Sequence, residues 1–335
     1  MYTYIILLGT LAGCVHQEND TAAPQLIDST PSSISSETHE SFPTTGQGWA
    51  DVFNRNYNET QTLCKDPDGR ERGLYWCSGV MVRTVNNDGY VPWSISPNAA
   101  RVGGTSFSWI RHDEGTRMLY HPAGYIWMSP ADYIGMKGNS SPPQGMIAWS
   151  DHHACIYPFD ASTLSGNRAP YGCGLLSTKG SGSQPPDLPT RIPNPSAWGS
   201  CNQPPLSFTT AAQWNNHFQQ QAGGVYSRSC SWYSDSSQYW LNMISSRQSF
   251  PRPLVWNEFM IDNDFGNNPQ YFQNPITAFF YDVHRTGGLA AARKFQTDLA
   301  TANEGPRRAP ILRLDFDAPN ASRFSYNAGD QVAYP

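Results

Sequence analysis

The chain has 335 residues and a formal net charge of −5, from 22 Lys and Arg against 27 Asp and Glu. Only 15% of its residues are charged, and it has no Lys/Arg run, which argues against nucleic acid as a partner. The 11 Trp, 17 Tyr and 28 Gly are typical of an exported, loop-rich globular protein and less so of a cytosolic one.

Residues 1–14 predict a lipoprotein signal peptide. Residues 4–13 form an apolar run that is too short to span a bilayer but fits the core of a signal peptide. The run ends in Leu-Ala-Gly-Cys at positions 11–14, which resembles the lipobox of bacterial lipoproteins, with Cys14 as the lipidated residue. The alternative is an ordinary secretory signal, since residues 1–3 carry no Lys or Arg. We therefore expect an exported protein, anchored in the outer membrane through a lipid or secreted.

Residues 15–47 are rich in Ser, Thr, Glu and Pro and almost lack aromatic side chains, so they cannot bury enough apolar surface to offset their ordering entropy. We interpret them as a disordered tether. Residues 48–335 then form a single domain. It begins with a helix, because Trp49, Phe53 and Tyr57 recur at helical spacing.

Six further cysteines predict a disulfide framework. Their number is even and they lack the Cys-x-x-Cys spacing of a zinc site, so in an exported chain they favour disulfides, and we expect no metal site. They are Cys64, Cys77, Cys155, Cys173, Cys201 and Cys230. The sequence does not choose among about fifteen pairings, of which the sequential one is the simplest.

Residues 73–85 predict a strand that places Arg83 near its end, on the same side as Tyr75 and Met81. A guanidinium in this place can form two parallel hydrogen bonds to a carboxylate or phosphate. The alternative is a strand-end arginine whose charged head extends to water.

Residues 103–111 predict a second strand. Because alternate residues face opposite ways, Ser106 and Ser108 share one face, and Phe107 and Trp109 share the other. Two hydroxyls beside a Gly-Gly entry are suited to a polar ligand near the backbone. The alternative is two small residues under a packed loop.

The middle of the chain predicts two short strands, at 124–129 and 145–150, and then a Pro/Gly/Ser-rich insertion at about 160–205 that the cysteines hold in place. Helical patterns follow at 209–221 and after a capping Asp235.

Residues 251–262 predict a strand with mostly apolar residues on both faces, which is typical of a strand covered on both sides. Glu258 is the one carboxylate within it before its last residue. Buried carboxylates are usually paired, neutralised or functional, because burying an unpaired charge is costly. The alternatives are an edge strand with Glu258 in water, or a structural ion pair.

The C-terminal part predicts a strand at 275–283, a helix at 288–302 and a strand at 309–316. A helix between two strands favours a crossover connection and parallel pairing. With the short strands upstream, the whole pattern predicts an α+β chain.

In chain order, Arg83, the pair Ser106 and Ser108, and Glu258 resemble the Arg–Ser–Glu constellation of ADP-ribosyltransferase-like enzymes. This resemblance implies an ADP-ribosyltransferase-like mixed β core with peripheral helices and disulfide-pinned loops.

Three stretches, at 75–83, 104–111 and 274–281, look like those of halovibrins, which are secreted bacterial NAD glycohydrolases. The resemblance runs through most of residues 48–335. Two departures stand out: Trp256 replaces the acidic or Gln residue that many transferases place two positions before the catalytic Glu, and residues 106–108 read Ser-Phe-Ser in place of Ser-Thr-Ser. The first departure speaks against transfer to a protein side chain and is compatible with hydrolysis.

The resemblance implies cleavage of the N-glycosidic bond of NAD, with NAD as substrate and no cofactor. Glu258 would stabilise the oxocarbenium-like ribosyl cation, for which a preorganised carboxylate in a dry site is well suited. The implied binding roles are the pyrophosphate for Arg83, the nicotinamide ribose for Ser106 and Ser108, and stacking on the nicotinamide ring for Phe107 or Trp109.

Other classes stay open: an ADP-ribosyltransferase toxin, a carbohydrate-binding or carbohydrate-cleaving surface lipoprotein, and a non-catalytic adhesin. Carbohydrate cleavage would need exposed coplanar aromatic side chains and a second carboxylate facing Glu258, for which Asp262 and Asp264 are the candidates. The sequence leaves an immunity or host protein partner undetermined.

Overall fold

The computed structural model describes residues 41–85, 104–137, 153–157, 232–233, 236–248, 254–262, 276–302 and 308–334. The chain divides into two units, Met1–Thr38 and His39–Pro335, and all described residues belong to the second. The expectations for the signal peptide with Cys14, most of the tether, the strand at 145–150, the insertion at 160–205 and the helix at 209–221 lie outside the described residues.

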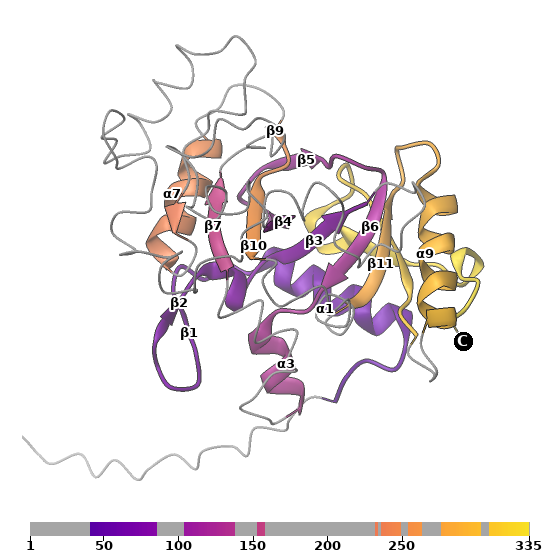
Figure 1. The fold of residues 1–335 in the computed structure, drawn as a ribbon, viewed down its shortest axis with the longest axis horizontal. Coiled ribbons are helices and arrows are strands. Elements are labelled where there is room, and N and C mark those ends of the chain that lie inside the picture. Colours follow the sequence, from indigo (N-terminus) through magenta and orange to yellow (C-terminus); the bar gives the residue numbers. More distant parts are fainter. Residues whose placement is uncertain are drawn as a thin grey trace, which may run out of the picture. The chain divides into compact units, whose positions relative to one another are not determined.

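A mixed sheet forms the centre of the second unit (Figure 1). Its described strands follow the order β13-β12-β11-β6-β3-β4-β10-β7-β8, and every neighbouring pair is antiparallel except β11 and β12. The bounds are β3 Val80–Thr84, β4 Gly104–Ile110, β6 Ala123–Trp127, β7 His153–Tyr157, β8 Trp232–Tyr233, β10 Glu258–Asp262, β11 Ile276–Asp282, β12 Ile311–Leu314 and β13 Phe324–Tyr326.

Two small sheets accompany the large one. In the first, β1 (Cys64–Lys65) pairs with β2 (Glu71–Arg72). In the second, β5 (Thr116–Met118) runs parallel to β9 (Leu254–Val255). Helices and a mixed sheet together confirm the α+β class.

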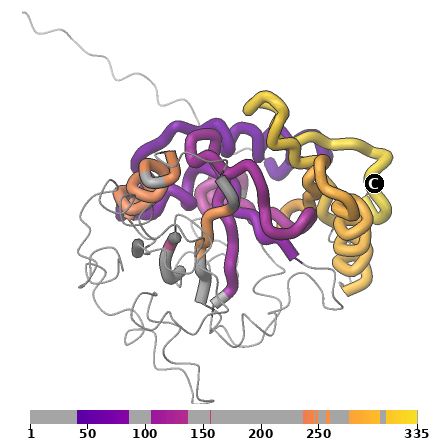
Figure 2. Tube along the Cα trace, turned by 90° about the horizontal axis from the view of Figure 1, so that it is seen from above, coloured from indigo at the N-terminus to yellow at the C-terminus, as the bar shows by residue number. Residues whose placement is uncertain are grey.

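The described α-helices are α1 Gly46–Asn58, α3 Pro130–Lys137, α7 Ser237–Gln248 and α9 Gly288–Ala302. Helix α9 packs on β6, β11 and β12, α1 on β3, β12 and β13, and α7 on β7 and β8. Figure 2 shows α7 and α9 at opposite ends of the sheet. The helix α9 connects the parallel strands β11 and β12, which confirms the predicted crossover.

Short 3-10 helices complete the described elements: η1 Leu74–Trp76, η6 Asn320–Ser322 and η7 Ala328–Asp330. The predicted strand at 73–85 was wrong in its first half, which forms η1, so Tyr75 does not lie on a strand with Arg83. Gly79 explains the break: its φ is 70°, and a Cβ there would lie 2.2 Å from Nε1 of Trp109. Only glycine fits both conditions without strain.

The core around β4, β10 and α7 consists of large aromatic side chains. The Trp240 ring of α7 lies 4.7 Å from that of Trp109 and 5.4 Å from that of Phe259, measured between centroids. Tyr75 lies 5.2 Å from Phe259. These contacts fasten α7 to β4 and β10, because aromatic pairs bury large areas and favour such tilted geometries.

The prediction of one continuous strand at 251–262 was also wrong. The segment forms β9 and β10, which pair in different sheets, and Trp256 and Asn257 separate them. At the break, the side chain of Asn257 hydrogen-bonds to the backbone of Trp109 in place of a strand-to-strand bond. Glu258 consequently becomes the first residue of β10.

The disulfide Cys64–Cys77 is present and confirms the first bridge of the sequential pairing. Cys155 belongs to β7, but its side chain lies outside the described residues, as do Cys173, Cys201 and Cys230. The remaining pairings therefore stay predictions.

Candidate functional site

The three segments singled out in the sequence lie on three adjacent strands at the middle of the sheet. Arg83 belongs to β3, Ser106 and Ser108 to β4, and Glu258 to β10, in the order β3-β4-β10. Two interstrand spacings amount to about 10 Å, so the outer strands of this triplet lie within the length of a dinucleotide.

Arg83 and the serines face opposite sides of the sheet. Val82 is the register partner of Ser108, and paired residues share a face, so the neighbouring Arg83 points to the other one. The guanidinium carbon of Arg83 accordingly lies 5.7 Å from the ring centroid of Phe107. Arg83 and Phe107 thus share one face, and Ser106 and Ser108 the other.

Glu258 belongs to the face of the serines. Phe259 is the register partner of Phe107, and its ring packs into the aromatic core beside Tyr75. Glu258 precedes Phe259 in the same strand and therefore faces the side of Ser108. Its side chain is only 2% exposed. The sheet therefore unites the serines with Glu258 and separates both from Arg83.

Arg83 is a buried cation with few partners. It is 6% exposed, its Nη1 donates to the carbonyl oxygen of Ser106 at 2.9 Å, and no other described residue forms a hydrogen bond with its Nε. Within the described ranges, no carboxylate forms an ion pair with it. Burying a guanidinium is costly, and a nearby negative charge would offset part of that cost.

Two predicted ligand-stacking residues belong to the core. Phe107 and Trp109 are almost wholly buried. The Phe107 ring lies 4.5 Å from that of Trp127, and Trp109 packs against Trp240. In this structure neither ring offers a free face to a ligand.

Tyr120 is an exposed aromatic side chain that contacts Trp256. It is 58% exposed, and its ring centroid lies 5.1 Å from that of Trp256, at 68° between the ring planes. Trp256 stands two positions before Glu258. The pairing of Met118 with Val255 between β5 and β9 brings the two rings together, a long-range contact that no local pattern signals.

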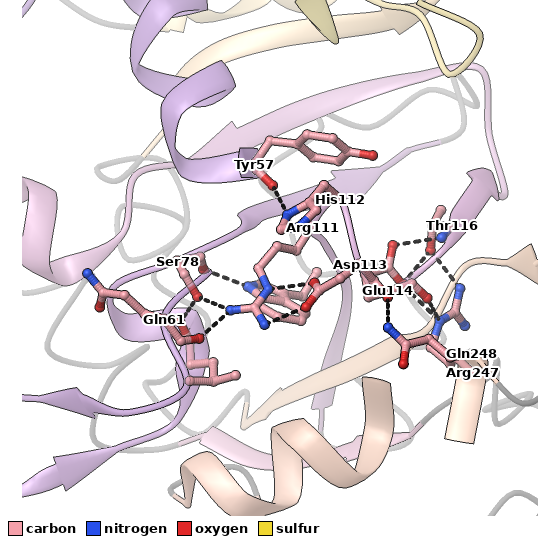
Figure 3. A network of polar contacts seen from close by, with 12 residues as sticks. Tyr57, Gln61, Ser78, Arg111, His112, Asp113, Glu114, Thr116, Arg247 and Gln248 are labelled. Carbon is pink, nitrogen blue, oxygen red and sulfur yellow. Dashed lines mark hydrogen bonds and ion pairs between the residues drawn. The ribbon is translucent and has the colours of Figure 1, made fainter. Parts of the chain in front are cut away.

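The segment that follows β4 is a centre of polar contacts (Figure 3). Arg111 binds both carboxylate oxygens of Asp113, at 2.7 and 2.8 Å. Its Nη1 also donates to the carbonyl oxygen of Gln61 and the hydroxyl of Ser78. These bonds tie the end of β4 to the segments that precede β3.

Glu114 is the centre of a second group of polar contacts (Figure 3). It forms a buried ion pair with Arg247 of α7, in which Nε of Arg247 lies 2.8 Å from Oε2 of Glu114. Thr116 donates to Glu114 from its backbone N–H and its hydroxyl, and Asn257 donates from Nδ2 at 3.0 Å. Burial raises the pKa of the Glu114 carboxyl, while the charge of Arg247 opposes the shift. Sequence reasoning missed this cluster, because nothing in the local pattern links residues 114, 247 and 257.

One described group has the donor atoms of a metal site. His284, Asp315 and Asp317 each place a potential ligand atom within 4.8 Å of the others. His284 Nε2 lies 2.8 Å from Asp315, at the surface beyond β11. Since β11 stands four places from β10 in the sheet, the group is separate from Glu258.

No protein-family model matches this sequence, and no curated protein matches it either. Among the described helices, none is both long and apolar enough to cross a bilayer.

Proposed function

We propose that the chain cleaves the N-glycosidic bond of NAD to nicotinamide and ADP-ribose, on an ADP-ribosyltransferase-like core. The observation that carries the proposal is the order β3-β4-β10, in which the strands that contain Arg83, the Ser-x-Ser pair and Glu258 are adjacent, with the serines and Glu258 on one face. The sequence resemblance to halovibrins supports the same reaction.

In the proposed reaction, the bond between the ribose C1′ and the pyridinium nitrogen breaks, and its electron pair leaves with nicotinamide. Nicotinamide is then neutral, so its departure needs no strong acid. The positive charge remains on the ribosyl group, where the Glu258 carboxylate stabilises it. Water adds to C1′ and loses a proton to solvent, which completes ADP-ribose.

In this proposal, the residues that act on the ribose and the residue that binds the pyrophosphate lie on different faces of the sheet. Ser106, Ser108 and Glu258 share the face on which the ribose would react. Arg83 lies on the other face, next to the last residue of β3. Arg83 therefore contacts the pyrophosphate only if the dinucleotide passes around the end of the strands, from one face of the sheet to the other.

ADP-ribosyl transfer to a protein is the second candidate, and it differs only in the acceptor. Trp256 occupies the place where many transferases carry an acidic or Gln residue, which favours water as the acceptor.

Carbohydrate cleavage has less support. Asp262 is the last residue of β10, four residues or about 13 Å of strand from Glu258, and Asp264 lies outside the described residues. The rings of Tyr120 and Trp256 are close to perpendicular and not coplanar.

The test is incubation of the purified chain with NAD and measurement of released nicotinamide and ADP-ribose. Glu258→Gln keeps the shape of the side chain and removes its charge, so turnover should fall by roughly 10²–10³-fold. The thermal midpoint should stay close to that of wild type, because Gln keeps the shape of the side chain and can still form hydrogen bonds. Glu59→Gln, at the end of α1, is the matched control and should retain full activity.

A wild-type chain that releases no nicotinamide refutes the proposed function. If Glu258→Gln stays within a few-fold of wild type, or loses activity only by unfolding, the catalytic role of Glu258 fails. A structural ion-pair role for Glu258 would then be the better interpretation.

A further inference from the structure

We propose that Asn257 is a positioning residue, whose side-chain amide fixes the start of β10 against β4 and thereby sets where Glu258 lies relative to Ser108. This inference rests on the proposed function, because it concerns the geometry of the carboxylate that meets the ribosyl cation.

The amide of Asn257 replaces a missing strand-to-strand contact. Its Oδ1 accepts from the backbone N–H of Trp109 at 2.8 Å, and its Nδ2 donates to the carbonyl oxygen of the same residue. The backbone carbonyl of Asn257 accepts from the hydroxyl of Ser108 at 3.1 Å. Asn257 therefore holds both β4 residues that lie beside the start of β10.

A buried carboxylate fixes the orientation of this amide. Nδ2 of Asn257 also donates to Oε2 of Glu114. A carboxylate only accepts hydrogen bonds, so the NH2 group must face Glu114, and a flipped amide would oppose two acceptors. Arg247 and Thr116 hold Glu114 in place in turn. The chain of contacts thus extends from α7 to the residue before Glu258.

Asn54 forms the same pair of side-chain-to-backbone hydrogen bonds as Asn257, so it can serve as a control position. Asn54 of α1 accepts from the N–H of Phe324 and donates to its carbonyl oxygen, both at 2.8 Å. Among the described residues, Asn54 forms no hydrogen bond to a buried carboxylate, and it lies beside β13, which is six places from β10 in the sheet order. Its substitution should remove a like number of backbone contacts without moving Glu258.

The position of Glu258 matters because its charge must meet a cation that forms at one atom. A displacement of about 1 Å can lower turnover by about 10²-fold, even when the displaced group stays chemically intact. Loss of the Asn257 amide frees the first residues of β10 from β4, so we expect a loss in kcat greater than any change in KM.

The experiment compares Asn257→Ala with Asn54→Ala in the full chain, using thermal midpoint, kcat and KM for NAD. Both variants should lower the midpoint. Only Asn257→Ala should lower kcat, by roughly 10²-fold, with KM within about three-fold of wild type. Asn257→Gln provides a second variant that keeps both donors and the acceptor but moves the amide by about 1.5 Å, and it should lower kcat while folded.

Equal kcat values for the Asn257 and Asn54 variants would overturn the positioning role and leave the proposed function intact. The same holds if Asn257→Gln is folded and as active as wild type. If the wild-type chain releases no nicotinamide, the proposed function fails first and this inference falls with it.

Discussion

Nε of Arg247 lies 2.8 Å from Oε2 of Glu114, and both side chains are almost wholly buried although 133 residues separate them in the sequence. The pair connects α7 to the segment that follows β4. Burying two charges is costly, so such a pair contributes by holding segments in one arrangement more than by net attraction.

Replacing only one residue of the Glu114–Arg247 pair should lower the free energy of unfolding more than replacing both. Arg247→Met leaves the Glu114 charge buried and uncompensated, and should lower the free energy of unfolding by about 3–5 kcal/mol. The double variant with Glu114→Gln removes both charges and should be more stable than Arg247→Met alone. Urea unfolding of the two single variants and the double variant measures this, and strictly additive losses would contradict it.

If the buried guanidinium of Arg83 binds the pyrophosphate of NAD, it should also bind inorganic pyrophosphate. Inorganic pyrophosphate should then raise the thermal midpoint of the wild-type chain, and this rise should disappear in Arg83→Met. Arg83→Lys keeps the charge but loses the forked geometry, so KM for NAD should increase more than kcat falls.

Without pyrophosphate, Arg83→Met should be at least as stable as wild type, because a buried charge is replaced by an apolar side chain. If wild type and Arg83→Met respond equally to pyrophosphate, the anion is bound elsewhere. If KM for NAD is unchanged in both variants, the dinucleotide does not reach this face of the sheet.

Asp330 should make the chain sensitive to acid. Burial by itself would raise the pKa of the Asp330 carboxyl, but hydrogen bonds from Arg313 and Tyr281 and the charge of Arg313 lower it below the usual 3.8. A lowered pKa contributes stability that is present above about pH 3.8 and is lost as the pH falls through the folded-state value.

Asp330→Asn should therefore be less stable than wild type near neutral pH, and the difference should shrink as the pH falls below 3.8. Chemical unfolding of both chains across this range is the measurement. A difference that stays constant with pH would assign the effect to packing.

The disulfide Cys64–Cys77 joins the two ends of a short loop, with a sequence separation of 13. Replacing both cysteines by alanine should lower the free energy of unfolding by about 3 kcal/mol. Thiol titration of the denatured, unreduced chain tests the wider prediction that all six downstream cysteines are oxidised. Nearly no free thiol is expected, and four or more would refute a complete framework.

Local sequence patterns predicted the elements that depend on the periodicity of neighbouring residues. The helix predicted at 288–302 has the observed bounds of α9, because its apolar residues recur with helical spacing. Alternation along residues 103–111 correctly separated Ser106 and Ser108 from Phe107, because side chains in any extended strand alternate. The apolar neighbours of Glu258 favoured its burial but left open an edge strand with the carboxylate in water, and the structure confirms the buried position.

Only the tertiary structure decided how these segments combine. Alternation orders side chains within one strand, whereas the register between strands depends on contacts distant in sequence, and that register places Arg83 and Glu258 on opposite faces. The break before β10 likewise depends on the backbone of Trp109, to which Asn257 bonds across 148 residues of sequence. Glu114 and Arg247 tolerate burial only because folding brings each to the other.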